Sequence, residues 1–178
     1  MLRRADSLNP DDPRILAEYG KTLTSAGRAA DALPVFDKAL AVDPDNWRTL
    51  SAQGVALDQV GQHEAARTVY RAAIAAAPGE PTPWNNLGMS YALTNDLKDA
   101  ELAMRKAVST PKASGKMRQN LALVLGLRGD YTDAERLASA PTTPAAIGGD
   151  AEKLRAIVTQ PAMWAREANA DNIPVIIE

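Results

Sequence analysis

One alanine recurs every 34 residues through most of this chain, and this period constrains the fold more than any other feature. The alanine column comprises Ala32, Ala66, Ala100 and Ala134. In this register the sequence divides, with no insertion or deletion, into four consecutive units: 13–46, 47–80, 81–114 and 115–148. A short unit repeated in this way is typical of arrays in which each unit buries its apolar face against its neighbours.

Three columns of small residues predict that each unit is a pair of closely packed antiparallel helices. Position 20 of the unit holds the alanine column, and position 8 holds Gly20, Gly54, Gly88 and Ala122. Position 27 holds Ala39, Ala73 and Ala107, with Pro141 in unit four. Small side chains let two helix axes approach, whereas larger ones at the crossing would force the axes apart.

The residues between the paired helices predict tight turns. Position 15 holds residues suited to the left-handed backbone that ends a helix: Gly27, Gly61, Asn95 and Gly129. Prolines near the end of a unit stop the second helix, and they are Pro44, Pro78 and Pro111. Each unit is therefore expected to run helix, turn, helix, turn.

Larger apolar residues recur at helical spacing between the small ones, and they predict the core. At positions 4, 11 and 24 they include Leu16, Leu50, Trp84, Leu23, Leu57, Tyr91, Leu125, Phe36, Tyr70 and Met104. Aromatic residues make up only 4% of the chain, and this scarcity together with the many alanines favours closely packed helices over a β-sandwich. The predicted fold class is all-α.

The fullest set of these features lies in unit three, in Trp84-Asn85-Asn86-Leu87-Gly88-Met89-Ser90-Tyr91 followed by Ala100, Met104 and Ala107. Together with the four in-phase units, this set resembles the tetratricopeptide repeat (TPR). The resemblance implies a right-handed TPR superhelix, or α-solenoid, of four helix-pair repeats. It also implies a concave face lined by the first helix of each unit.

The segments on either side of the four units follow a different pattern. Residues 1–12 fit the last third of a preceding unit, so we expect the chain to begin inside a partial repeat with further sequence upstream. The second helix of unit four is degenerate because Pro141 interrupts it, so the array should end there. Residues 149–178 predict a C-terminal capping helix, a further short turn or helix, and an extended apolar tail at 173–177.

The composition argues against several kinds of chemistry. The chain has no cysteine and a single histidine, His63, so neither thiolate nor multi-histidine metal sites are expected. Its formal net charge is −2 without a basic cluster, so nucleic acid is not an expected partner. The sequence offers neither a nucleophile paired with a base nor a phosphate-binding loop. We expect a protein that is not an enzyme and that uses no cofactor, metal or small-molecule substrate.

The first-helix positions that the core does not use predict a partner-binding groove. In units one and two they are largely charged: Arg14, Glu18, Lys21, Arg48, Ser51, Asp58 and Gln59. In units three and four they are mostly amide or apolar, and they form the candidate site: Asn85, Asn86, Met89, Leu93, Lys116, Gln119, Asn120, Leu123 and Leu127. Asn86 and Asn120 share one repeat position, where each amide could bond an extended peptide backbone or simply be solvated.

A narrower resemblance adds a cellular role. It rests on residues 54–59 and 84–88, on a closing stretch at 154–164, and above all on Arg118-Gln119-Asn120-Leu121-Ala122-Leu123-Val124-Leu125-Gly126-Leu127. These segments resemble the D-component (TadD) family of the tight-adherence, or Flp, pilus assembly system. The resemblance implies a bacterial outer-membrane lipoprotein that faces the periplasm and helps to assemble the pilus and its secretin.

Two functions are therefore open. The first is a non-enzymatic protein-protein interaction scaffold that binds a peptide or partner, such as a pilus or secretin component, in its groove; its periplasmic location would need an upstream leader with a lipid-modified cysteine. The alternative is a generic cytosolic TPR adaptor or regulatory module. Self-association through the N-terminal end, or through the tail at 173–177 lying in a groove, is a further expectation.

Overall fold

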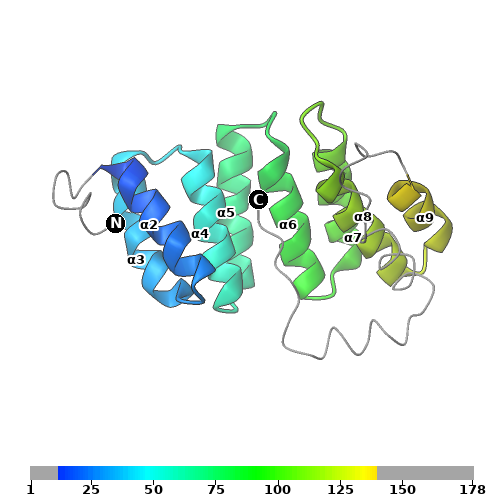
Figure 1. Ribbon diagram of the computed structural model, residues 1–178, viewed down its shortest axis with the longest axis horizontal. Coiled ribbons are helices and arrows are strands. Elements are labelled where there is room, and N and C mark those ends of the chain that lie inside the picture. The colour runs from blue at the N-terminus through cyan, green and yellow to red at the C-terminus, as the bar shows by residue number, and fades with distance from the viewer. Residues whose placement is uncertain (1–11, 140–178) are drawn as a thin grey trace.

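The computed structural model describes residues 12–139 of the 178-residue chain. Over this range the chain forms eight α-helices and no strand (Figure 1), so the predicted all-α class is confirmed. The helices form four pairs: α2 (Pro13–Ser25) with α3 (Ala29–Val42), α4 (Trp47–Gln59) with α5 (His63–Ala76), α6 (Pro81–Leu93) with α7 (Leu97–Val108), and α8 (Gly115–Arg128) with α9 (Tyr131–Ser139).

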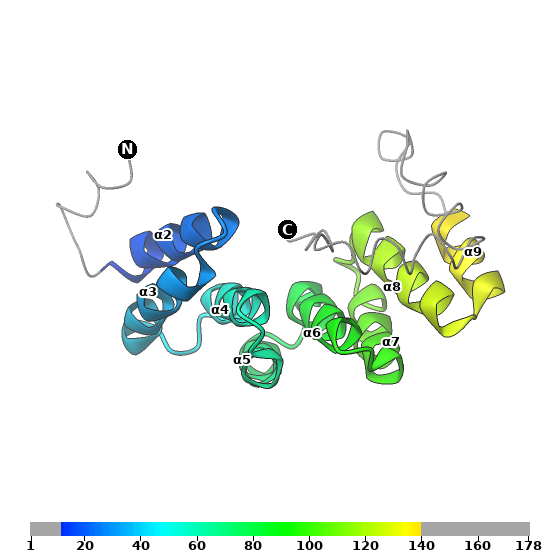
Figure 2. The same cartoon turned by 90° about the horizontal axis from the view of Figure 1, so that it is seen from below.

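The four pairs stack side by side into a curved solenoid. Each second helix packs against the first helix of the next pair, and the first helices α2, α4, α6 and α8 also contact one another in sequence. Seen along the helices in Figure 2, these first helices follow the inside of the arc, while α3, α5 and α7 lie on its outside. The concave face is therefore built from the first helix of every pair, as the resemblance given above implies.

Four of the helices, α2, α4, α7 and α8, begin where a side chain accepts a hydrogen bond from a free backbone N–H. Asp12 caps α2, with 2.9 Å between Arg14 N and Asp12 Oδ1, and Pro13 supplies the first helical residue. Asn46 caps α4 through Thr49 N at 3.1 Å, and this cap follows the turn at residues 43–46. The sequence Asp-Pro-Asp-Asn there is therefore a turn between units.

The turns inside the pairs adopt the backbone that the sequence predicts. Position 15 has a positive φ in all four units, at 74°, 78°, 61° and 89° for Gly27, Gly61, Asn95 and Gly129. Glycine takes this conformation without strain, and asparagine tolerates it better than most other residues. The prediction of a left-handed turn residue is confirmed for each unit.

The core depends on contacts between a glycine on the first helix and a large side chain on the second. A Cβ built on Gly20 would lie 2.6 Å from the Phe36 ring, and one on Gly54 would lie 2.4 Å from Tyr70. In the third pair Gly88 faces Met104 in the same way, at 2.5 Å. The large side chains are completely buried, so the absence of a side chain on the first helix makes room for them.

Several sequence predictions concern residues outside those described. They are the partial repeat at 1–12 apart from the Asp12 cap, the later part of unit four after Ser139, and the capping helix and tail at 149–178. The division into units 13–46, 47–80, 81–114 and 115–148 remains our proposal for the repeat boundaries.

The contact between Gly20 and Phe36 can be tested by adding one methyl group. We expect Gly20→Ala to lower the free energy of unfolding by about 1–2 kcal/mol, because a Cβ 2.6 Å from the Phe36 ring implies an overpacking cost of about 2–3 kcal/mol, which outweighs the helix-propensity gain of about 1 kcal/mol. Urea denaturation measures the change. Gly79→Ala is the control, since nothing lies within 4 Å of a Cβ there.

A double-mutant cycle identifies Phe36 as the cause. In a Phe36→Leu background the same Gly20→Ala substitution should cost clearly less, because the smaller side chain can move away. Gly20→Ala could instead leave the free energy of unfolding unchanged, or lower it equally in the wild-type and Phe36→Leu backgrounds. Either result would show that the Gly20–Phe36 contact does not set the spacing of the two helices.

Candidate functional site: a groove across the first helices

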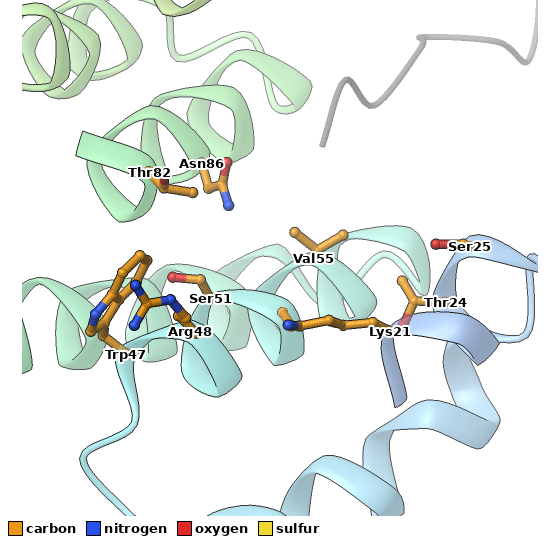
Figure 3. A pocket seen from close by; sticks show the side chains of 10 residues that line it. Lys21, Thr24, Ser25, Trp47, Arg48, Ser51, Val55, Thr82 and Asn86 are labelled. Atoms are coloured by element: carbon orange, nitrogen blue, oxygen red, sulfur yellow. The ribbon is translucent and has the colours of Figure 1, made fainter. Parts of the chain in front are cut away.

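A groove of about 420 Å³ opens on the concave side between α2, α4 and α6. Ten residues from three successive units line it: Lys21, Thr24, Ser25, Trp47, Arg48, Ser51, Ala52, Val55, Thr82 and Asn86. Figure 3 shows Thr82 and Asn86 reaching from α6 toward the α4 side chains, with Lys21 and Thr24 contributed by α2. The groove therefore crosses the helices instead of running along one of them.

The charged groups in the groove are cations. The Arg48 guanidinium stacks on the Trp47 ring, with 4.3 Å from Cζ to the ring centroid. This cation–π contact holds an exposed arginine in one place while leaving its N–H groups available. The Lys21 ammonium lies 2.7 Å from a carboxylate oxygen of Glu18 on the same helix.

Two neutral polar side chains in the groove have unused hydrogen-bonding capacity. Ser51 is only 5% exposed, yet its hydroxyl has no partner among the described residues. Buried hydroxyls are almost always paired, so this group is an unsatisfied donor in the groove lining. Asn86 is 9% exposed, and its Nδ2 points into the groove in Figure 3.

The Asn86 amide is held by a chain of amides that runs deeper into the array. Asn120 Nδ2 donates to Asn85 Oδ1 at 3.0 Å, and Asn85 Nδ2 donates to Asn86 Oδ1 at 3.3 Å. The three side chains are almost completely buried between α6 and α8. The hydrogen bond at Asn86 Oδ1 leaves the NH₂ group of Asn86 as the end that faces the groove.

These contacts change the interpretation of the amides predicted from the sequence. The structure places the two amides differently: Asn120 Nδ2 donates to Asn85 Oδ1 and the Asn120 side chain is only 5% exposed, so the contact of Asn120 with an incoming peptide stays a prediction. The cavity beside it, between α6 and α8, measures only about 10 Å³. Within units three and four, Asn86 is the amide that lines the larger groove.

The other candidate residues of units three and four lie half-buried on α6 and α8. Met89 packs against the core cluster formed by α7, α8 and α9. The remaining five are Leu93, Lys116, Gln119, Leu123 and Leu127. Lys116 lines the small cavity, and the 420 Å³ groove lies toward the N-terminal side of this set.

Asp58 does not contribute to the charged floor that the sequence predicts. Its carboxylate is buried and accepts hydrogen bonds from Tyr70 Oη at 3.1 Å and Ser90 Oγ at 2.8 Å, and it lies 2.9 Å from His63 Nδ1. These partners come from α5 and α6, so Asp58 joins three helices. Burial raises the pKa of Asp58, although its three hydrogen-bond partners act in the opposite direction.

The presence of Ser, His and Asp in one cluster does not make a catalytic triad. Ser90 donates to the carboxylate and not to the imidazole, and Ser90 has no exposed surface. A nucleophile needs a hydrogen bond to its base and access to substrate. The geometry here is that of a structural polar cluster between units two and three.

Residues 12–139 were also searched for metal-binding clusters and membrane-spanning helices. That part of the chain contains no group of three or more metal-ligating side chains. It also contains no helix that is both long and apolar enough to cross a membrane.

Comparison with known families agrees with the geometry. A model of the tetratricopeptide repeat matches residues 2–46, 19–81 and 51–117, and a second tetratricopeptide model matches 120–140. The chain belongs to the tetratricopeptide repeat family. A search of curated protein sequences found no match.

Solved tetratricopeptide structures share this superhelical fold. A thermophilic TPR protein of Thermus thermophilus, TTC0263, superposes with a TM-score of 0.79 at 21% identity, over 89% of this chain and 87% of its own. The type IV pilus biogenesis factor PilW superposes with a TM-score of 0.73 at 22% identity, over 86% of this chain and 71% of its own. YrrB, described as a TPR protein with an unusual peptide-binding site, superposes with a TM-score of 0.64 at 19% identity, over 95% of this chain and 87% of its own.

The buried carboxylate of Asp58 predicts a pH-dependent contribution to stability in this tetratricopeptide array. Because burial raises the pKa of Asp58 in the folded state, folding favours the protonated carboxyl, and stability falls as pH rises from about 4 through the raised pKa. An asparagine at this position cannot ionise, so the stability of wild type relative to the Asp58→Asn variant should fall over that range.

Urea unfolding of both chains between pH 4 and 8 measures this difference. The comparison is repeated in a His63→Ala background, which removes the imidazole beside the carboxylate. A difference that stays constant or grows with pH would contradict the stated effect of burial.

Proposed function

We propose that this protein is a non-enzymatic scaffold that holds an extended segment of a partner protein in the groove between α2, α4 and α6. The observation that supports this most is a 420 Å³ groove on the concave face, in which the Ser51 hydroxyl and the Asn86 NH₂ group have no hydrogen-bond partner among residues 12–139. Groups of this kind are stabilised by a ligand backbone or side chain that supplies the missing partner.

The direction of the groove favours an extended segment as the ligand. Its lining comes from three successive first helices, so a ligand that touches Lys21, Ser51 and Asn86 must cross the helices. An extended peptide presents backbone groups and side chains at regular intervals along such a path. Apolar surface from Trp47 and Val55 lies between the polar groups and can take up side chains of the peptide.

The candidate residues of units three and four extend this surface in the proposal. Met89, Leu93, Leu123 and Leu127 provide half-buried apolar positions on α6 and α8. Lys116 and Gln119 provide polar ones on α8. A partner segment longer than the groove could continue across them.

The cellular role that we propose is assembly of a Flp/Tad-type pilus and its secretin, with the protein facing the periplasm from an outer-membrane anchor. Support comes from the resemblance of the stretch at 118–127 to the TadD family and from the shared fold of PilW, a type IV pilus biogenesis factor. The partner segment would then belong to a pilus or secretin component.

Blocking the groove tests the binding proposal. Peptides are selected from a displayed library of random dodecapeptides against the full chain, and their affinities are measured by fluorescence polarisation. Thr82→Trp places a bulky side chain in the groove, so the affinity should fall at least tenfold, about 1.4 kcal/mol.

Thr68→Trp is the matched control, because it makes the same change at an exposed position of α5 outside the groove. It should change the affinity by less than twofold, and circular dichroism should show that both variants are folded. Equal losses in the two variants, or a library that yields no binder, would contradict peptide binding in this groove.

The pilus assignment has a separate test in the source organism. Deletion of the gene should abolish surface pili, wild type and Thr68→Trp should restore them, and Thr82→Trp should not. Normal pili in the deletion strain would overturn the proposed cellular role while leaving peptide binding intact.

A further inference from the structure

We infer that the groove between α2, α4 and α6 selects a partner segment that carries an aspartate or glutamate side chain, whose carboxylate binds between Arg48, Ser51 and Asn86. This inference rests on the proposed peptide binding and adds the chemistry of the ligand. Three observations support it: the charge of the groove, the unpartnered hydroxyl and the orientation of one amide.

The charge of the groove favours an anion. Its ten lining residues include Lys21 and Arg48 but no aspartate or glutamate. Arg48 has no carboxylate partner among residues 12–139, and its stacking on Trp47 fixes the guanidinium beside the groove. Arginine held in this way presents several N–H donors in a plane, an arrangement that suits a carboxylate.

Lys21 already shows that a carboxylate can lie near this site. Its ammonium pairs with Glu18 at 2.7 Å, but the Glu18 side chain is 63% exposed. Exposed pairs of this kind contribute little to stability, so an incoming carboxylate can replace Glu18 at small cost.

The buried hydroxyl of Ser51 is the second observation. It lies on α4 one helical turn after Arg48, in the groove lining, and its buried oxygen is unpartnered among the described residues, so the Ser51 side chain must rotate toward the groove to meet a ligand. A hydroxyl can donate to a ligand oxygen, and a carboxylate oxygen is a stronger acceptor than a backbone carbonyl.

The orientation of Asn86 is the third observation. Because Asn120 donates to Asn85 and Asn85 donates to Asn86 Oδ1, the amide chain has one direction and ends with the Asn86 NH₂ group at the groove. Asn86 Nδ2 has no partner within residues 12–139, and Figure 3 shows it pointing toward α4. Asn120 and Asn85 are thus positioning residues, because they orient a donor that belongs to Asn86.

Arg48, Ser51, Asn86 and Lys21 therefore all line the same groove, and each carries a hydrogen-bond donor. A carboxylate side chain accepts from several donors at once and carries the complementary charge, whereas a lysine or arginine side chain could satisfy none of the cationic groups. We commit to an acidic side chain of an extended protein segment as the occupant.

The composition of the selected dodecapeptides gives the first test. They should be enriched in Asp or Glu at one position, and a synthetic copy with blocked ends should lose at least tenfold in affinity when that residue is changed to its amide. Binders without acidic enrichment, or binders indifferent to the amide change, would overturn the inference and leave the proposed function standing. Failure to select any binder would overturn both.

A pair of arginine variants locates the carboxylate. Arg48→Gln should weaken the acidic peptide at least tenfold but the amide version less than threefold, because only the charged ligand uses the guanidinium. Arg28→Gln makes the same charge change at an exposed site outside the groove and should affect neither peptide by more than threefold. Equal effects of Arg48→Gln on both peptides would contradict the inference.

An isosteric variant tests the amide chain. In Asn85→Asp the new carboxylate accepts from Asn120 and cannot donate to Asn86, so Asn86 should turn its NH₂ group toward residue 85 and present its oxygen to the ligand. The acidic peptide should then bind at least tenfold more weakly, with a smaller loss for the amide version.

Gln62→Glu adds the same charge at an exposed position just before α5, outside both the groove and the amide chain, and it should change the affinity less than threefold. Both variants should unfold at similar urea concentrations. Equal losses of affinity in Asn85→Asp and Gln62→Glu, or equal effects of Asn85→Asp on the acidic and amide peptides, would show that the amide chain does not determine selectivity.

Discussion

The whole array depends on one contact that recurs in three of the four helix pairs: a glycine on the first helix against a large buried side chain on the second. Gly20 faces Phe36, Gly54 faces Tyr70 and Gly88 faces Met104. In the fourth pair the same two repeat positions hold Ala122 and Ala138, so a larger first residue is matched by a smaller second one. This contact sets the spacing within a pair, and a similar spacing in successive pairs lets them stack side by side.

Because the core lies between the two layers of helices, the inner face of the first helices is left for polar groups. Some of these groups stabilise the array itself, as Asp58 does by joining α4, α5 and α6 through Tyr70 and Ser90. Others line the groove, where Ser51 has no partner within residues 12–139 and Arg48 is held only by Trp47. The distinction between the two sets separates residues that build the solenoid from those that can bind a partner.

The fold could be predicted from the sequence because each of its elements has a local cause. The left-handed turns follow from Gly27, Gly61, Asn95 and Gly129, and the helix crossings follow from the small residues 34 residues apart. The site could be predicted only in part. Repeat position shows that Asn120 and Asp58 lie on the inner side of a first helix, but it does not show that Asn120 bonds Asn85 across α6 and α8 or that Asp58 reaches Ser90. Those contacts depend on how neighbouring first helices meet, which a single repeat does not encode.

The central claim is that a partner segment binds across α2, α4 and α6. Nuclear magnetic resonance of ¹⁵N-labelled full chain, titrated with a selected peptide, tests it most directly. We expect the largest backbone and side-chain amide shifts at residues lining the groove, including the Asn86 side chain, and only small shifts in α3 and α7. Largest shifts on those outer helices, or confined to α8 and α9, would contradict the claim.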